Sequence, residues 1–282
     1  MAITNFIPEV WAAELLSSLK KSLVYAGPGV VNRDYEGEIA NQGDTVHITS
    51  ISRPTIGTYT KNVTTITPET LTDAERSLNI DQAKYFAFEV DDVDMRQSRD
   101  GGRLMSEAAA EAGYGLADVA DQYVAGLYTG VAAGNLIGAT SITDAAKAVA
   151  GVLALKTKLD EASAPATGRY VIVPPWYHSL LLQSDLFARL DASGSTDGLR
   201  NGIVGRAWGM DVLMSNNVPV IAGDDYAVQA GVPGAIAYAD QVNKVEAYRP
   251  QDSFSDALKG LQLYGAKVTR PTAFAVLTAS VT

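Results

Sequence analysis

Two histidines are the only side chains of this chain that could serve as imidazole bases. His47 lies in a stretch rich in β-branched residues, and His178 follows Trp176 and Tyr177. Neither histidine has a glutamate or a second histidine at metal-ligand spacing. No Gly-x-Ser-x-Gly nucleophile motif is present, although the members of a Ser-His-Asp triad can be distant in sequence. We therefore interpret both histidines as structural or surface residues.

An acidic run and a glycine series are the other patterns that could bind a ligand. The acidic run lacks the spacing of an EF-hand loop and is interpreted as the solvated start of a helix. Its members are Asp91, Asp92 and Asp94. The glycine series lacks the Gly-Lys-Ser/Thr ending of a phosphate loop, which favours turn and packing roles. It comprises Gly198, Gly202, Gly205 and Gly209. The sequence thus predicts no catalytic residue, no cofactor and no metal, and a protein that is not an enzyme.

The composition limits the classes of partner. With 282 residues, 47% of them hydrophobic, the chain can bury one large core or two modest ones. A formal net charge of -10 repels phosphate backbones and argues against general nucleic-acid binding. The absence of cysteine excludes disulfides and thiolate sites and suits folding in a reducing cytoplasm. The 25 glycines indicate a thin, loop-rich body rather than a compact enzyme.

Two segments bear on the question of a membrane. Residues 122–143 are uncharged and carry glycines at fourfold spacing, but their polar side chains favour a helix end that runs into a loop. Residues 1–10 lack the basic and apolar regions of a secretory signal. We therefore expect no membrane partner.

The first ninety residues are predicted as an arm followed by a projecting loop. Residues 1–43 form the arm, in which an amphipathic helical pattern containing Trp11 and Leu15 ends at a Gly-Pro-Gly sequence. Residues 44–51 and 78–90 show β-branched or alternating patterns and are predicted as two paired strands.

Residues 54–72, between these strands, contain eight threonines and two prolines and cannot bury a core of their own. As a hairpin, each leg would reach ~30 Å, and such a finger is marginal alone in water. Its apolar side chains should therefore contact a neighbouring subunit. They are Ile56, Tyr59, Val63 and Ile66. The alternative is a disordered surface loop.

The remaining chain is predicted as a long helix and an α/β block. Apolar residues at spacings of three and four predict a helix over 104–127 that packs closely against a sheet. Within 143–240, a helix capped by Thr143 or Asp144 precedes a buried strand at 170–173, a helix over 176–190 and short strands at 211–215 and 235–239. Strands around Leu261 and Leu263 and around Phe274 and Val276 are expected to return to the long-helix block.

Three local patterns occur in an order that resembles a known family. They are Phe-Ile-Pro-Glu-Val-Trp-Ala-Ala-Glu-Leu-Leu at 6–16, Gly-Ile-Val-Gly-Arg-Ala-Trp-Gly-Met-Asp-Val at 202–212 followed by Ser-Asn-Asn-Val-Pro at 215–219, and Tyr-Gly-Ala-Lys-Val at 264–268 before Arg270 and Pro271. In this order they resemble the major capsid proteins of tailed double-stranded DNA bacteriophages, over nearly the whole chain.

The resemblance implies an α+β protein with the Hong Kong 97-type capsid fold. The N-terminal arm would be residues 1–43 and the extended β-hairpin loop residues 44–90. Residues 91–142 and 241–282 would form a peripheral domain with its spine helix, and residues 143–240 an inserted axial domain.

The implied function is structural: self-assembly, as pentamers and hexamers, into an icosahedral shell that encloses phage DNA without sequence-specific binding. The implied location is the virion, with assembly in the host cytoplasm. A portal protein and, since no long scaffolding segment precedes the arm, a separate scaffold are expected partners, and decoration proteins are compatible with this function. Lys61 is the one lysine near the loop tip that could form a covalent cross-link, although no asparagine acceptor is identifiable.

Candidate subunit-interface residues come from the arm, the loop and the arginines that could pair across contacts. They are Trp11, Leu15, Arg53, Ile56, Tyr59, Lys61, Val63, Ile66, Arg76, Arg99 and Arg249. Two alternatives stay open: an encapsulin-like nanocompartment shell of the same fold, and a soluble α/β enzyme with an unrecognised site.

Overall fold

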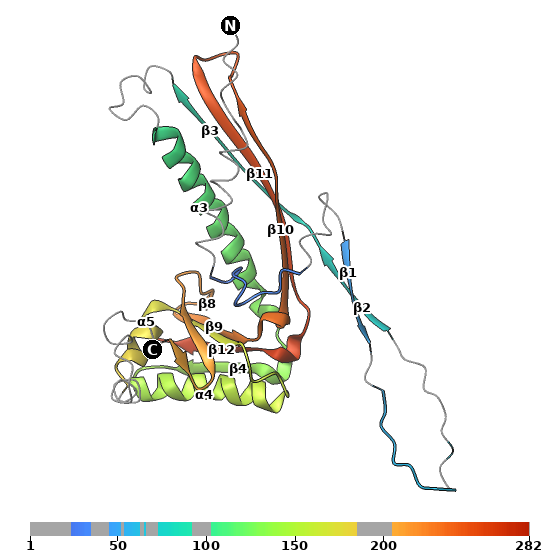
Figure 1. The fold of residues 1–282 in the computed structure, drawn as a ribbon. Coiled ribbons are helices and arrows are strands. Elements are labelled where there is room, and N and C mark those ends of the chain that lie inside the picture. Colours follow the sequence, from blue (N-terminus) through green and yellow to red (C-terminus); the bar gives the residue numbers. More distant parts are fainter. Residues whose placement is uncertain are drawn as a thin grey trace.

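The computed structural model describes residues 24–34, 45–51, 54–62, 65, 73–91, 103–184 and 205–281. Figure 1 shows two connected bodies and a projecting ribbon. One body is a long three-stranded sheet with a long helix beside it, and the other contains a seven-stranded sheet. The ribbon is a separate two-stranded sheet that points away from both bodies.

The long sheet has the strand order β10-β11-β3, with antiparallel pairs. Its elements are β3 (Gln82–Asp91), β10 (Ile236–Tyr248), β11 (Ser255–Val268) and the adjacent helix α3 (Arg103–Ala125). Side chains of β3 alternate between half-buried and exposed, so one face is covered and the other is open. On the covered face, Phe86 and Val245 pack with Leu116 and Ala117 of α3. This helix lies where the sequence predicts one over 104–127.

The ribbon consists of β1 (Thr45–Ile51) and β2 (Asp73–Asn79), paired antiparallel. The expected strand at 44–51 is present, but the single strand expected over 78–90 is wrong. The chain leaves β2 after Asn79 and resumes pairing at Gln82, where β3 joins β11 instead of β1. Alternation continues through Leu78 and Ile80, so the sequence pattern carries no mark of the change of partner.

The seven-stranded sheet has the order β4-β12-β9-β5-β7-β6, and β8 pairs with β9 beside this path. Its strands are β4 (Leu136–Ser141), β5 (Arg169–Val173), β6 (Arg206–Ala207), β7 (Met210–Met214), β8 (Val220–Ala222), β9 (Asp225–Gly231) and β12 (Phe274–Ser280). Short 3-10 helices occur at Gly126–Gly130, Ala133–Asn135, Pro233–Ala235 and Pro271–Ala273. None of the helices in the described ranges combines the length and apolarity needed to cross a bilayer.

Helices α4 (Ala145–Glu161) and α5 (Pro175–Leu182) pack on one face of this sheet. The Asp144 side chain caps α4 by accepting a hydrogen bond from the backbone N–H of Lys147 at 2.8 Å. The Tyr177 hydroxyl donates to the Ala148 carbonyl at 2.7 Å. This close approach requires Gly151, because a Cβ there would overlap the Tyr177 hydroxyl and Leu277.

Three expectations for this body need correction. Phe274 and Val276 lie in β12, which pairs with β9 and β4, so they do not return to the long-helix block. The helix expected over 176–190 ends at Leu182. Residues 122–143, expected as a helix end and loop, also contain β4, whose side chains are only half-buried or exposed and therefore give a weak strand pattern.

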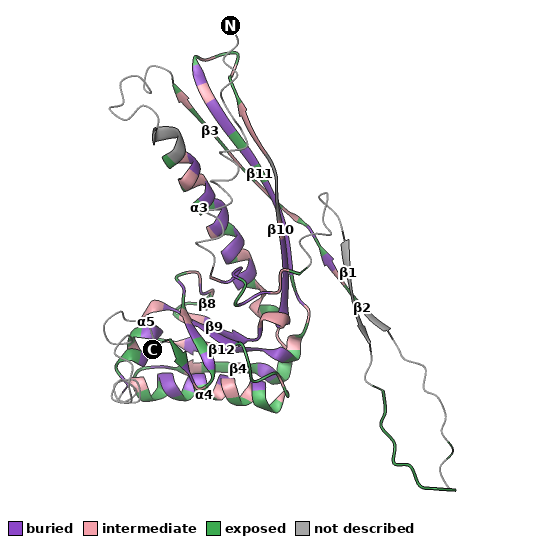
Figure 2. Cartoon of the chain, viewed as in Figure 1, coloured by how far each residue is buried: buried purple, intermediate pink, exposed green. Residues whose placement is uncertain are grey.

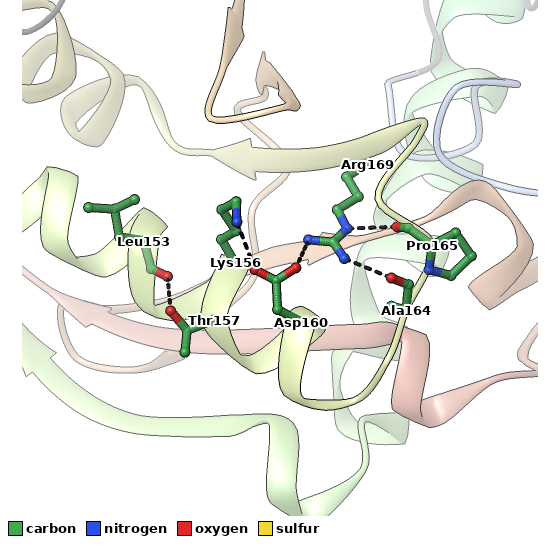
Figure 3. Close-up of polar contacts among 7 residues, drawn as sticks. All are labelled: Leu153, Lys156, Thr157, Asp160, Ala164, Pro165 and Arg169. Carbon is green, nitrogen blue, oxygen red and sulfur yellow. Dashed lines mark hydrogen bonds and ion pairs between the residues drawn. The ribbon is translucent and has the colours of Figure 1, made fainter.

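Arg169, at the start of β5, fixes the connection from α4 (Figure 3). Its side chain is 3% exposed, and its Nη1 lies 2.6 Å from Oδ1 of Asp160. Nη2 donates to the Ala164 carbonyl and Nε to the Pro165 carbonyl, each at 2.7 Å. The planar guanidinium thus satisfies a carboxylate and two backbone carbonyls at once, which a lysine cannot do.

We predict that Arg169→Ala destabilises the chain by about 3 kcal/mol, because it leaves two backbone carbonyls without their donor. Urea unfolding measures this change. Lys156→Ala is the matched control: Lys156 also pairs with Asp160, at 2.7 Å, but its side chain is 35% exposed. Its loss should cost less than about 1 kcal/mol. Equal effects of the two substitutions would contradict the assigned role of Arg169.

Candidate assembly surfaces

The loop at 54–62 is exposed along its whole described length, as is Thr65 (Figure 2). Ile56 is 83% and Tyr59 66% exposed, and Lys61 is also exposed. Residues 54–62 contain no helix or strand. Because these apolar side chains are exposed to water, they contribute no burial energy to the fold of the single chain. They are therefore available to contact another surface.

The base of the ribbon is fixed to the long sheet. Leu78 and Ile80 are buried with Ala237, Ala239 and Leu263. This small apolar cluster determines where the ribbon leaves the body.

Polar contacts and one glycine complete the base of the ribbon. Lys267 Nζ donates to the Ser77 carbonyl at 2.7 Å, and Arg76 Nη1 donates to the Val268 carbonyl at 3.5 Å. A Cβ at Gly265 would overlap the Asn79 backbone carbonyl. The chain can therefore cross β11 at this point only because residue 265 has no side chain.

A second exposed surface is the face of the long sheet opposite α3, which we call the open face. Tyr85 of β3 is 80% exposed and lies directly opposite Leu261 of β11. Tyr248 of β10 is partly exposed, and Lys259 lies over its ring at 5.1 Å while pairing with Glu246 at 2.9 Å.

The hairpin that joins β10 to β11 carries Phe254, which is 82% exposed. Sequence reasoning did not single out Phe254 or the open face. The signal was present in β3, where Tyr85 alternates with Phe86 and Phe88, so that apolar side chains point to both faces.

The predicted interface residues are distributed over several elements. Ile56, Tyr59 and Lys61 share the exposed loop. Arg76 lies on the ribbon, and Arg249 pairs within its own hairpin, with Nε 3.8 Å from Oδ1 of Asp256. The structure does not bring these residues together within one chain. Outside the described residues are Trp11, Leu15, Arg53, Val63, Ile66 and Arg99.

The residues first considered for chemistry lie in separate elements. His47 is in β1, whereas His178 is buried in α5, where burial lowers its pKa. Gly209 lies in the turn between β6 and β7 with a φ of 80°, as predicted, and Gly205 precedes β6 with a φ of 60°. Gly198 and Gly202 lie outside the described residues. Among the described residues, no three His, Cys, Asp or Glu side chains cluster to hold a metal ion.

A sequence model of the family described as phage capsid protein matches residues 74–277, more than half of the chain. The chain belongs to the phage capsid protein family. A solved structure from Mycobacterium phage Che8 is similar over 98% of both chains, with 34% identity and a TM-score of 0.75. The capsid of cyanophage P-SCSP1u covers 93% of this chain and 90% of its own, with 18% identity and a TM-score of 0.72. No curated protein sequence matches the chain.

These similarities show that the capsid protein has the Hong Kong 97-type fold and forms part of a phage shell in the virion. The predicted α+β class and capsid family are confirmed. The encapsulin SrpI from Synechococcus elongatus is similar in fold only, at 14% identity and with a TM-score of 0.56, over 86% of this chain and 85% of its own. Family membership implies a structural role rather than a catalytic one.

We predict that Gly265→Ala disturbs the base of the ribbon. The added Cβ must displace the backbone at Asn79, which should cost about 1–3 kcal/mol in the free energy of unfolding. Urea unfolding of the unassembled capsid protein measures this loss.

Gly115→Ala is the control, because a Cβ at this exposed position of α3 meets nothing within 4 Å. Alanine is the better helix former, so this variant should be up to about 1 kcal/mol more stable than wild type. If Gly265→Ala behaves like Gly115→Ala, the close crossing at Asn79 does not constrain the fold.

Proposed function

We propose that the capsid protein builds its shell by laying residues 54–72 and the first part of the N-terminal arm, residues 1–23, on neighbouring copies, because residues 24–34 of the arm are held on their own body. The observation that carries this proposal is the complete exposure of 54–62, including Ile56 and Tyr59. A segment without its own core or strand pairing gains stability only from a partner surface. In a closed shell the available partner is another copy of the chain.

The open face is the described surface best suited to receive such a segment. Tyr85 and Leu261 provide apolar area, and the neighbouring carboxylates of Glu89 and Asp91 complement the charge of Lys61. Apolar contacts would supply the affinity, whereas the charges would orient the approach. Trp11, Leu15, Val63 and Ile66 would add apolar contacts from the arm and loop. Arg53 and Arg99 would pair across subunits, whereas Arg76 and Arg249 also contact their own chain. The proposed axial domain is centred on residues 143–240, as the sequence predicts, but its sheet also includes β4 and β12 from outside these limits.

We further propose the finer features of assembly. The shell would contain pentamers and hexamers, would form in the host cytoplasm with a separate scaffold and a portal, and would accept decoration proteins. The chain itself would have no catalytic activity. Its net charge of -10 supports a shell wall that encloses DNA without holding it tightly.

The loop contact is tested with the double variant Ile56→Ser/Tyr59→Ser. Both side chains are exposed in the single chain, so its unfolding free energy should change by less than about 0.5 kcal/mol. Each buried apolar side chain contributes about 1.5–3 kcal/mol at a contact, so the concentration needed for assembly should rise at least about tenfold. Light scattering and electron microscopy measure shell formation.

Thr58→Ser is the matched control, because it alters the same exposed segment without removing a large apolar side chain. It should assemble like wild type. Tyr85→Ser tests the receiving face, and its effect should not add to that of the double variant if the two surfaces meet. Assembly of Ile56→Ser/Tyr59→Ser at the wild-type concentration would refute the loop contact.

A separate prediction concerns DNA. The purified capsid protein should not shift double-stranded DNA in a gel at moderate salt, because its net negative charge opposes the phosphate backbone. Tight binding that weakens steeply with added salt would show instead a basic DNA-binding surface.

A further inference from the structure

Asp121 of α3 is a buried carboxylate with an unusual set of partners. The residue is 2% exposed, and its Oδ1 accepts hydrogen bonds from three consecutive backbone N–H groups. These are the N–H groups of Val24 at 2.9 Å, Tyr25 at 2.6 Å and Ala26 at 3.3 Å. We call residues 24–26 the strap.

The second oxygen of Asp121 binds a different part of the chain. Asn217, which follows β7, donates from Nδ2 to Oδ2 of Asp121 at 3.0 Å and to Oδ1 of Asp118 at 2.8 Å. Gln122 holds the other oxygen of Asp118 at 2.7 Å. One side chain on α3 therefore joins the strap to the turn between β7 and β8 of the seven-stranded sheet.

The hydrogen-bond donors to Asp121 stabilise a carboxylate that is almost completely buried. Its hydrogen-bond donors within the described ranges are neutral, namely backbone N–H groups and an amide. Burial raises the pKa of Asp121, while the hydrogen bonds from Asn217 and the strap lower it. A buried charge is tolerated only when it is hydrogen-bonded, so the strap and Asp121 depend on each other.

The chain after the strap is fixed as well. Asn32 exchanges backbone hydrogen bonds with β10, donating to Ile236 at 2.8 Å and accepting from Tyr238 at 2.9 Å. Arg33 pairs with Asp240 at 3.2 Å and lies over the Tyr238 ring. Residues 24–34 are thus held at both ends, by α3 and by β10.

The start of the strap lies at the surface. Val24 lines a cleft of about 200 Å³ together with Tyr114, Asp118 and Met214. Tyr114 and Met214 are 55% and 52% exposed. Val24, the first residue that the structure describes, thus joins the strap to the preceding part of the chain at an accessible surface.

We propose that Asp121 is the positioning residue of the N-terminal arm: by holding the strap against α3 and Asn217, it fixes the point to which residues 1–23 are joined. This inference rests on the proposed function, in which the arm contacts neighbouring copies. The loop and the open face play no part in it. A fixed exit point lets every copy present its arm in the same direction, which a closed symmetric shell requires.

The strap is tested on the unassembled full-length capsid protein by amide hydrogen exchange. Asp121→Ala removes the acceptor, so protection of the amides of residues 24–26 should fall at least about tenfold, with the amides of β5 and β9 unchanged. Asp121→Asn keeps an oxygen acceptor and should retain most of this protection. Asn217→Ala should lower it by about threefold, although Asn217 donates no hydrogen bond to the strap. Glu111→Ala, which removes an exposed carboxylate from the same helix, should leave it unchanged.

Two hydrogen-exchange results would overturn the proposal. Wild-type protection of residues 24–26 in Asp121→Ala would show that the carboxylate does not hold the strap. If Asp121→Ala fails to fold, Asp121→Asn is measured in its place. If its amides then lose protection to the same extent in residues 24–26 and in the rest of the chain, Asp121 has a general structural role instead. Shell formation is then measured with the same variants.

Asp121→Ala should reduce shell yield at least about fivefold while its loop and open face stay intact. Normal yield with a released strap would overturn the role of Asp121 in directing the arm. That outcome would leave the loop contact untouched, because the loop contact is tested by the separate variants at Ile56 and Tyr59.

Discussion

The structure depends on one apolar core at the junction of its two bodies. Tyr170 and Phe274 of the seven-stranded sheet, Tyr238 and Tyr264 of the long sheet, and Tyr25 from the N-terminal segment are buried in the same cluster. Gln229 of β9 donates from Nε2 to the carbonyl of Ala125, at the C-terminal end of α3, at 2.7 Å. Because strands of 13 and 14 residues leave this junction, a small change in its packing would move their distant hairpin by a much larger distance.

The ribbon and the N-terminal segment are each held to the body by contacts at their bases. The ribbon is fixed by Leu78 and Ile80 and by the crossing at Gly265, whereas the loop beyond it is exposed. The N-terminal segment is fixed by Asp121 and β10. This arrangement separates two tasks: buried contacts set direction, and exposed side chains remain available for other copies. A loop-rich chain with many glycines can perform both tasks, because only a few residues at each base are needed to set the direction.

The sequence predicted the elements whose patterns are local. The spacing of Leu116 and its neighbours placed α3, Asp144 placed the start of α4, and the continuous apolar run of 170–173 placed β5. The choice of a strand's pairing partner leaves no such local pattern. The sequence therefore did not predict the break between β2 and β3 after Asn79 or the pairing of β12 with β9. The positions of Trp11, Leu15, Val63 and Ile66 stay predictions.

The role of Asp121 was equally hidden from the sequence. Its backbone and amide partners are about a hundred residues distant, and a lone aspartate on a helix has the pattern of a solvated surface residue. The open face was missed for a related reason: exposed apolar residues on one side of a strand have no meaning until the covering helix is known. Contacts between capsid subunits are therefore harder to predict than the capsid fold, because they involve the residues that remain exposed after the single chain has folded.

The distribution of exposed apolar side chains also bears on how a shell can form without aggregation. Ile56, Tyr85 and Phe254 lie on three different elements, and each would contribute only a few kcal/mol at a contact. Association through one such contact is weak at ordinary protein concentrations, since a micromolar dissociation constant requires about 8 kcal/mol. Several contacts made at once by a correctly oriented copy exceed that threshold, whereas a misplaced copy makes only one. In the proposed assembly, fixed directions at the bases of the ribbon and arm would be as important for closure as the contacts themselves, because they would decide which copies can make all of the contacts together.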